Sequence, residues 1–363
     1  MLVLSAPATA VFAQTPASLS DADTAAIAGE VNGDIAKRNL EGVGQFHRQR
    51  GSRGYHSAAE LVVERARAYG LADVEILRFP VDGKIFYGTQ RSRMGWDADK
   101  GELGEVGDGR EAVVASFAAM AVALAQDSES AELVAELVDV GNGTSEADYA
   151  GKDVRGKIVL VARQPEAAQD LAIGRFGAVG MVSYAPNQTT AWSGDNQAQV
   201  RWGHLQSYSA HPTFAFMLSQ GAGKAYKARL AAGEAIRLHA SVRAGQHPGH
   251  YEIVTATIPG ADPALKDQEI AFSCHLDHQK PGANDNASGC VGILEVARTL
   301  QALIDGGAIT RPARTIRFIW PPEIEGTTAL LNARPDLARR IRAVIHMDMV
   351  GGGPQTPAVL HVP

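Results

Sequence analysis

The sequence predicts an α/β protein whose main sheet is mixed and mostly parallel, with helices on both faces. From Tyr251 onward, short apolar segments alternate with helical ones, as in sheets whose strands are buried. Residues 125–245 differ from this pattern, because β-rich segments there are separated by turns. We therefore expect two structural units, a main α/β domain and a β-rich region in the middle of the chain.

A loop, a helix and a strand are predicted near the N-terminus from "RGSRGYHSAAELVVERARAYGLADVEILRFPVDG". Ser57 and Glu60 have the spacing of a capping box, and the helical composition continues to Tyr69. Gly70 is expected to end the helix, and the alternating "VEILRFP" predicts a strand. This unit should pack on the larger sheet.

Four short apolar segments in the last third of the chain are predicted strands: "EIVTATIPG", "QEIAFSC", "RTIRFIW" and "RAVIHMDMVG". The segment "ASGCVGILEVARTLQALI" between the second and the third is a predicted helix. In sheets with parallel strands, ligands bind beyond the carboxyl ends of the strands. Functional side chains are therefore expected just after these segments.

The composition of the 363 residues, 45% hydrophobic and 20% charged with a net charge of -6, is that of an ordinary globular protein. No block of Lys and Arg is present, so neither nucleic acid nor a membrane is expected as a partner. With two cysteines only, a metal must bind His, Asp and Glu side chains. For Cys274 and Cys290 we favour packed thiols over a disulfide.

The N-terminal segment "MLVLSAPATAVFA", residues 1–13, has the apolar core and the small residues of a secretory signal, although a basic leader is missing. We predict that the protein is exported, to the periplasm or the medium. An apolar, frayed N-terminus is the alternative. No later segment approaches the ~20 apolar residues of a membrane span.

Candidate metal ligands begin directly after "QEIAFSC". His275 follows this strand, and Asp277 is placed to orient the imidazole through its second ring nitrogen. Asp285 lies in "PGANDNASG", a turn-rich loop that can bring a carboxylate back beside the histidine, where it could bridge two metal ions. Taken alone, Asp285 is more simply explained as part of an Asx turn or a helix cap.

The next two strands also end in polar side chains. Glu323 and Glu325 follow "RTIRFIW", where one glutamate can take a proton from water and the other can bind metal. Asp348 ends the following strand, and His346 on the same strand is interpreted as structural. Three successive strand ends with such residues, and a further one in the loop between, predict a metal site.

In order and spacing, "HLDHQKPGANDNASGCVGILEVARTL", "RTIRFIWPPEIEGTTALL" and "IHMDMVG" resemble the zinc aminopeptidase family of clan MH. That family also includes glutamate carboxypeptidases, glutaminyl cyclases and the transferrin receptor. The resemblance implies a zinc exopeptidase fold. The segments "DYAGKDVRGKIVLVAR" and "IGRFGAVGMVSYAPN" are similar to the protease-associated domain, although two strands of any α/β domain would look alike. The implied domains are an N-terminal catalytic part, an insertion and a metal-binding part, at residues 30–124, 125–245 and 251–363.

The resemblance also implies roles for single residues. His275 and Asp348 would bind one zinc ion, and Asp285 would bridge to a second. Asp277 would support His275, and Glu323 would act as the general base. The family's second glutamate ligand aligns with Ile324, so either Glu325 takes its place or the second ion is weakly bound or absent.

The family's last zinc ligand is a histidine further downstream than His361, so we expect a chain that is incomplete at its C-terminus. The resemblance implies a zinc-dependent exopeptidase with one or two zinc ions, most simply an aminopeptidase that acts on peptides. The alternatives are a receptor-like binding protein on the same fold and an enzyme of the carboxypeptidase or glutaminyl cyclase type. The presence of a predicted base beside predicted ligands favours an enzyme.

Overall fold

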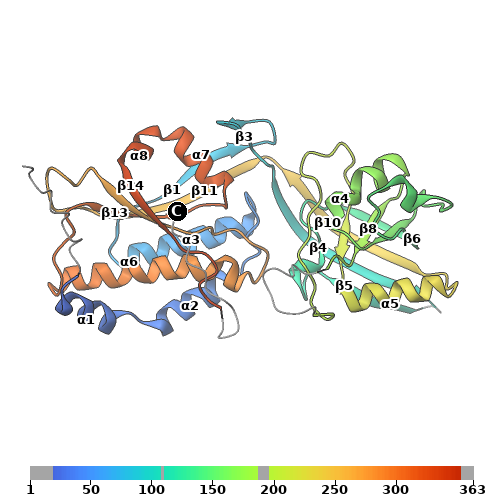
Figure 1. The fold of residues 1–363 in the computed structure, drawn as a ribbon, viewed down its shortest axis with the longest axis horizontal. Coiled ribbons are helices and arrows are strands. Elements are labelled where there is room, and N and C mark those ends of the chain that lie inside the picture. Colours follow the sequence, from blue (N-terminus) through green and yellow to red (C-terminus); the bar gives the residue numbers. More distant parts are fainter. Residues whose placement is uncertain (1–18, 108–109, 187–195, 353–363) are drawn as a thin grey trace, which may run out of the picture.

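Two sheets divide the chain into two domains, which lie side by side along the long axis of the molecule (Figure 1). The computed structural model describes residues 19–107, 110–186 and 196–352. The predicted signal segment, residues 1–13, lies outside the described residues.

The first domain is built on a five-stranded mixed sheet of strand order β1-β11-β13-β12-β14. β11 pairs antiparallel with β1 and β13, whereas β12 pairs parallel with β13 and β14. The mixed α/β fold is thus confirmed, with parallel pairing confined to the last three strands. The bounds are β1 (Ala72–Val81), β11 (Gly249–Ile258), β12 (Glu269–Ser273), β13 (Thr315–Trp320) and β14 (Ile341–His346).

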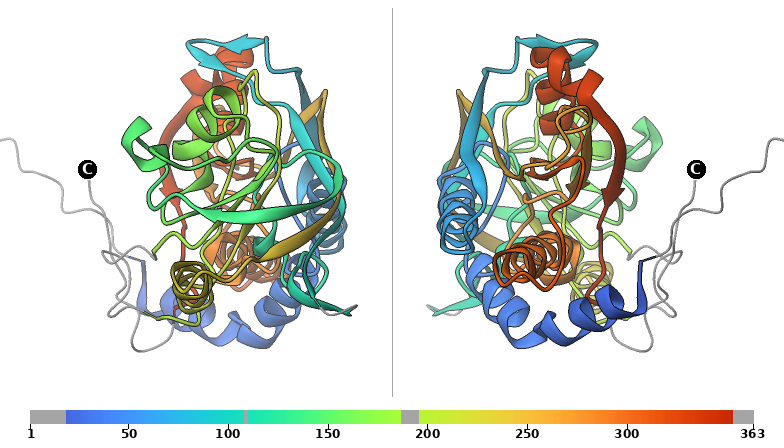
Figure 2. Two further views of the ribbon diagram at one scale, coloured as in Figure 1. Left: turned by 90° about the vertical axis from the view of Figure 1, so that its right-hand side faces the viewer. Right: turned by 90° about the vertical axis from the view of Figure 1, so that its left-hand side faces the viewer.

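Helices cover both faces of this sheet, as predicted. α3 (Arg53–Ala68) and α6 (Gly289–Asp305) pack on one face, and α7 (Glu325–Ala333) and α8 (Pro335–Arg340) lie on the other. The end views show α6 and α8 on opposite sides of the sheet (Figure 2). Two further helices, α1 (Asp21–Glu30) and α2 (Gly33–Val43), pack on the outside of α6.

The main hydrophobic core lies between the sheet and the helices α3 and α6. Apolar side chains at helical spacing on both helices meet apolar side chains of β11 and β13, which explains why these segments fold together. Contrary to the prediction from the sequence, the segment Ala283–Asp305 is long and apolar enough to cross a membrane, but 67% of its apolar window is buried inside this core. Fully buried members of the core include Tyr55, Ala58, Val62, Ile293, Phe318 and Trp320.

Helix α3 begins earlier than predicted. Its N-cap is Ser52, whose side chain accepts a hydrogen bond from the Tyr55 amide (3.0 Å), so the capping box expected at Ser57 is wrong. The Ser57 hydroxyl donates to the Arg53 carbonyl within the helix (3.1 Å). The earlier start buries Tyr55 on the same face as the later apolar residues. The end agrees with the prediction, since Gly70 follows with a φ of 79°.

The second domain is a seven-stranded sheet of order β5-β4-β10-β6-β7-β8-β9, antiparallel from β5 to β6 and parallel from β6 to β9. Two helices, α4 (Pro165–Gln169) and α5 (Gln220–Ala231), belong to this domain. The strands are β4 (Gly95–Gly107), β5 (Arg110–Ser116), β6 (Ala131–Asp139), β7 (Ile158–Val161), β8 (Gly180–Ser183), β9 (Ala215–Met217) and β10 (Arg237–His247).

The second domain is larger than the predicted insertion at residues 125–245. β4 and β5 precede residue 125, yet both belong to the second sheet, where β4 pairs with β10. β4 has the polar sequence "GWDADKGELGEVG", so its hydrophobic pattern does not reveal which sheet it joins. In the structure the second domain extends from β4 to β10.

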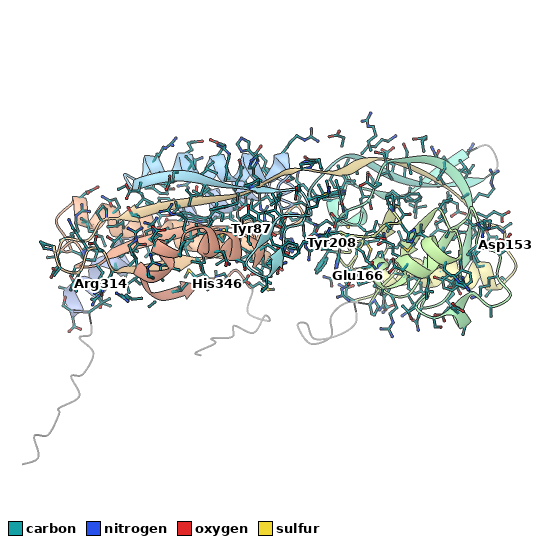
Figure 3. The ribbon with its side chains drawn as sticks, turned by 90° about the horizontal axis from the view of Figure 1, so that it is seen from above. Tyr87, Asp153, Glu166, Tyr208, Arg314 and His346 are labelled. Atoms are coloured by element: carbon teal, nitrogen blue, oxygen red, sulfur yellow. A yellow bond between two sulfur atoms is a disulfide. The ribbon has the colours of Figure 1, made fainter. Side chains whose placement is uncertain are left out.

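The chain passes between the domains twice. It leaves the first domain through a short hairpin, β2 (Phe86–Tyr87) with β3 (Gln90–Arg91), and returns where β10 is followed by β11, with Pro248 between them. Tyr208 of the second domain donates its hydroxyl to the carbonyls of Arg91 (3.0 Å) or Ser92 (3.1 Å). Figure 3 shows Tyr208 between the two domains, with Arg314 at one end of the molecule and Asp153 at the other.

His47 also lies at the junction. Its ring meets the rings of Trp96 and Phe117 edge to face, with centroids 5.8 and 5.0 Å away. The Lys280 amide donates to His47 Nδ1 (3.2 Å), so the ring is the neutral tautomer with its proton on Nε2. Burial, followed by the nearby charges of Arg48, His278 and Lys280, lowers the pKa of His47 to about 3.

This histidine should make the fold sensitive to acid. In the unfolded chain the pKa of a histidine is near 6.5, so between pH 6.5 and 3 the unfolded state binds more protons. The stability due to neutral His47 is complete above pH 6.5 and falls as the pH approaches 3, by at most about 1.4 kcal/mol per pH unit. We expect His47→Phe to flatten the fall of the thermal midpoint between pH 7.5 and 4.5.

Exposed His250 supplies the control, because His250→Gln should leave the dependence of the midpoint on pH unchanged. Parallel curves for the wild type and His47→Phe over this range would contradict the prediction.

Candidate metal centre

The predicted site residues gather where the three parallel strands end. β12, β13 and β14 run in the same direction, so their carboxyl ends meet at one edge of the sheet. His275 follows β12, Glu323 follows β13 and Asp348 follows β14. Asp285 joins them from the turn before α6, where the Asp285–Asn286 peptide bond is cis.

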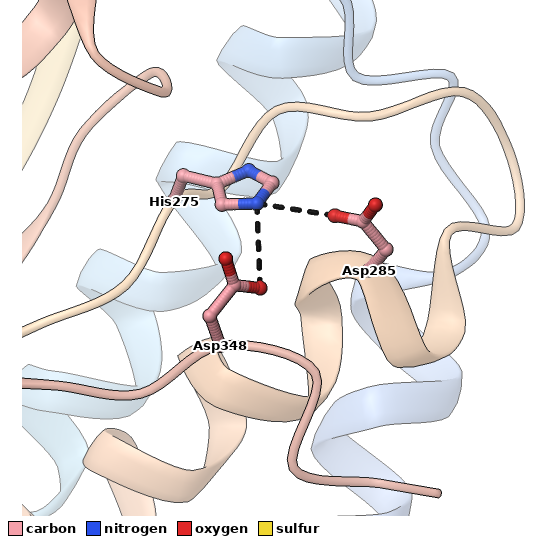
Figure 4. A group of neighbouring side chains, drawn as sticks. All are labelled: His275, Asp285 and Asp348. Atoms are coloured by element: carbon pink, nitrogen blue, oxygen red, sulfur yellow. Dashed lines mark ion pairs between the residues drawn. The ribbon is translucent and has the colours of Figure 1, made fainter. Parts of the chain in front are cut away.

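One imidazole and two carboxylates form the centre of the group (Figure 4). His275 Nε2 lies 3.1 Å from Asp285 Oδ1 and 3.6 Å from Asp348 Oδ1. The second carboxylate oxygen of Asp285 faces His278 Nε2 at 3.3 Å. The His275 side chain is 6% exposed and the two aspartates about 40% (39% and 41%), so the group opens to solvent on the carboxylate side.

Asp277 orients His275 by two contacts. The backbone carbonyl of Asp277 accepts the Nδ1 proton at 3.0 Å, and its carboxylate lies 3.5 Å from the same nitrogen. This leaves Nε2 directed at Asp285 and Asp348, the arrangement that a metal-binding histidine requires. The carboxylate of Asp277 also accepts the Glu323 amide proton (2.6 Å), which links the loops after β12 and β13.

The charges of the side chains around His275 favour the binding of a cation. Burial alone would lower the pKa of His275, but hydrogen bonds with Asp277, Asp285 and Asp348 raise it to about 12. Burial would raise the pKa of Asp277, yet Arg50 and then His275 hold it at about 2. Histidine and aspartate donors within 4.8 Å of one another fit zinc, so the residues present suit the ion that the fold implies.

Glu323 and Glu325 are separated by a strained turn. Ile324 has φ 52° and ψ -66°, and the Glu325 amide donates to the Glu323 carbonyl at 2.5 Å, which is the geometry of a γ-turn. The turn leaves Glu323 46% exposed beside Asp277, whereas the Glu325 side chain is 6% exposed. Glu323 joins a group of donors with His275 and Asp277.

Glu325, predicted as a metal ligand, is not brought into either group of donors in the described part of the chain. Its carboxylate instead forms ion pairs with Arg93 (2.9 Å) and Arg50 (3.0 Å). The sequence analysis identified neither arginine as part of the site, because each lies more than two hundred residues from Glu325. The separation between Arg93 and Glu325 is 232 residues.

Arg48 shapes the loop that carries His275 and Asp285. The side chain is completely buried, with 0% exposed, and its guanidinium donates only to backbone carbonyls. The Arg48 and His278 backbones also exchange two hydrogen bonds, of 2.9 and 3.0 Å. Nothing in the sequence pattern marks this residue. The acceptors are the carbonyls of Val43, Phe46, Leu276, Pro281 and Gly282.

Cys274 and Cys290 form a disulfide, so the prediction of packed thiols is wrong. The two Cα atoms are 5.3 Å apart because the end of β12 lies against the first turn of α6. A spacing of 16 residues in the sequence could not show this proximity. The disulfide ties His275 directly to the core.

A pocket of about 310 Å³ lies beside the metal-binding group, and both domains line it. The first domain contributes Asp285, Glu323 and Arg50 to this pocket, among others. From the second domain come Gln126, Trp202 and His204, and the rings of Trp202 and His204 stack with centroids 5.3 Å apart. No pattern in the sequence indicated that the middle region reaches the site.

A mixed α/β sheet with one histidine and two aspartates beyond its parallel strands, and a glutamate beside them, is typical of metal-binding domains of the metallohydrolase type. Comparison with known families agrees with this class. Residues 254–362 match peptidase family M28, and residues 129–226 match the PA domain.

Relatives and solved structures point the same way. Leucine aminopeptidase 1 of Pyrenophora tritici-repentis is 32% identical over 130 residues, 31% of either protein, and its counterpart in Pyrenophora teres f. teres is 33% identical over 128. An aminopeptidase from Aneurinibacillus sp. superposes with a TM-score of 0.53 at 25% identity, covering 90% of this chain and 72% of that one. A zinc aminopeptidase from Bacillus subtilis gives 0.57 at 20% identity, covering 87% and 69%.

The last third of the chain is thus similar to peptidase family M28 and the middle region to the PA domain, as the sequence resemblance implied. The matched segment spans about a third (31%) of the length of the curated relatives.

Metal analysis tests the proposed ligands. After dialysis against a zinc-containing buffer and then a zinc-free one, the wild-type chain should retain zinc. His275→Ala should lose it, because the imidazole that contacts both Asp285 and Asp348 is then missing. His346→Gln is the matched control, since His346 contacts the Ser273 hydroxyl (2.8 Å) and belongs to neither group of donors. Equal zinc content in wild type and His275→Ala would contradict the assignment.

Proposed function

We propose that the protein is a zinc-dependent aminopeptidase, which removes N-terminal residues from peptides by hydrolysis. The observation that carries this proposal is the group of His275, Asp285 and Asp348 with Glu323 beside it, at the carboxyl ends of the three parallel strands. The similarity to leucine aminopeptidases and to a zinc aminopeptidase supports the reaction and the metal.

In this proposal His275, Asp285 and Asp348 hold the ion. A zinc ion bound by three protein side chains supplies a Lewis acid that lowers the pKa of water to roughly 7. Asp277 keeps the imidazole of His275 in the correct orientation through the Nδ1 contact at 3.0 Å. The carboxylates of Asp285 and Asp348 are partly exposed, so a water molecule and a substrate carbonyl can reach the same point.

Glu323 is the proposed general base. Its amide is fixed by the Asp277 carboxylate (2.6 Å), and one of its own carboxylate oxygens contacts Arg50 (3.2 Å). The side chain remains 46% exposed and lines the pocket, so its other oxygen can take a proton from the attacking water. The same oxygen can then return the proton to the leaving amine.

The pocket between the domains is the proposed substrate site. Its wall of Trp202 and His204 offers aromatic surface to an apolar substrate side chain. The second domain would then take part in substrate binding directly. We also propose that the protein is exported, because a structural disulfide such as Cys274–Cys290 forms in an oxidising compartment.

Replacement of the base tests the mechanism. Glu323→Gln should reduce kcat for an aminoacyl 4-nitroanilide by 10²- to 10⁴-fold, the contribution of general base catalysis, without loss of zinc. Glu64→Gln, on the exposed face of α3, is the control and should retain full activity. A blocked N-terminus should abolish hydrolysis of a peptide; cleavage from the C-terminus of that blocked peptide would instead identify a carboxypeptidase. Wild-type activity in Glu323→Gln would rule out the assigned role.

Replacement of the aromatic wall tests the substrate site. Trp202→Ala should raise KM for peptides with a large apolar first residue by about tenfold, the effect of losing ~1–1.5 kcal/mol of aromatic contact. KM for an N-terminal alanine should change much less. Phe86→Ala is the control, because Phe86 is exposed and does not line this pocket. Equal KM changes for both peptides would show that Trp202 does not contact the substrate side chain.

A further inference from the structure

Three carboxylates from two loops converge on one guanidinium, that of Arg50. Arg50 Nε lies 2.9 Å from Asp277 and 3.0 Å from Glu325, and its terminal nitrogen lies 3.2 Å from Glu323. The Arg50 side chain is only 13% exposed, so these pairs are poorly screened by water. The nearby carboxylates outweigh burial and raise the pKa of Arg50, which keeps its charge.

Glu325 is enclosed by positive charge. One of its oxygens pairs with Arg93 Nε (2.9 Å) and the other faces Arg50. The second oxygen has no hydrogen-bond donor in the described part of the chain, so its contact with Arg50 is ionic. Glu325 would therefore be free to bind a metal ion only if Arg50 were removed.

The described residues do not complete a second metal position. Ile324, which aligns with the family's glutamate ligand, carries no donor and is 67% exposed. His278 and Asp285 face each other at 3.3 Å and offer two donors, one fewer than the three protein ligands of a catalytic zinc site. Both groups of three donors found in the described residues contain His275, so they cannot hold two ions independently.

We propose that Arg50 and Arg93 keep Glu325 from binding metal, and that the guanidinium of Arg50 supplies beside Glu323 the positive charge that a second metal ion supplies in two-metal sites. This inference rests on the proposed function, since it concerns the same site. A divalent ion beside Glu325 would face the fixed charges of Arg50 and Arg93, and like charges repel strongly where water is excluded. Arginine cannot lose its proton to relieve this repulsion.

Arg50 is then a positioning residue with two partners of different function. It holds one oxygen of Glu323 and one of Asp277, so it fixes the proposed base relative to the support of His275. The terminal nitrogen of Arg50 donates a hydrogen bond to Glu323, whereas its contact with Asp277 through Nε is ionic. The positive charge beside the base stays in place whether or not a substrate is bound.

Zinc titration of the full chain tests the proposal. Equilibrium dialysis at pH 7.5 should give one zinc ion per wild-type chain and also one per Glu325→Gln chain. Arg50→Met frees three carboxylates and should gain a second, weaker equivalent, which the double variant Arg50→Met, Glu325→Gln should lose. Arg50→Lys keeps the charge and should remain at one. Thermal melting of each variant shows whether it is folded.

Two zinc ions in the wild type, or loss of an ion in Glu325→Gln, would overturn the proposal, and neither result depends on the folding of an Arg50 variant. A folded Arg50→Met chain that still binds one ion would overturn the role given to the guanidinium. Activity separates this inference from the proposed function. Two ions with peptidase activity would refute only the role given to Arg50, whereas one ion without activity would refute only the peptidase.

Discussion

The loop that carries His275 and Asp285 depends on the buried guanidinium of Arg48. A buried charge is costly unless it is hydrogen-bonded. Here the guanidinium of Arg48 donates to backbone carbonyls of the loop itself and of the segment that ends α2. These bonds curve residues 276–282 around the guanidinium, between the end of β12 and the turn that presents Asp285. Arg48 thus places the metal-binding side chains although it lies more than two hundred residues before this loop. The separation between Arg48 and Leu276, one of its acceptors, is 228 residues.

The sheet and its polar strand ends could be predicted because the signals are local. Apolar runs identify the strands, and a residue two or three positions beyond a parallel strand must lie at the same edge as its counterparts. His275 and Asp348 were found in this way. Arg50 and Arg93 could not be found, since their partners lie far away in the sequence and no periodic pattern connects them; the separation of Arg50 and Glu323 is 273 residues.

The predictions that failed rest on local sequence patterns that are compatible with two different structures. Ser52 and Ser57 can each cap a helix, and the burial of Tyr55 decides in favour of Ser52. β4 is too polar to show which sheet it joins, so the second domain begins earlier than expected. Glu325 stands at a strand end as a metal ligand would, but the γ-turn at Ile324 and the two arginines direct its carboxylate away from His275. Tertiary contacts decide all three cases.

The two domains share a continuous backbone ladder instead of a flexible linker. β1 pairs with β11 as far as Gly249, and β4 pairs with β10 from His247, so the hydrogen-bonded ribbon is interrupted only at Pro248. A ribbon of this kind resists bending far more than a single strand of chain. We therefore expect the pocket that both domains line to keep its width, so that bulky molecules are kept away from the metal-binding group.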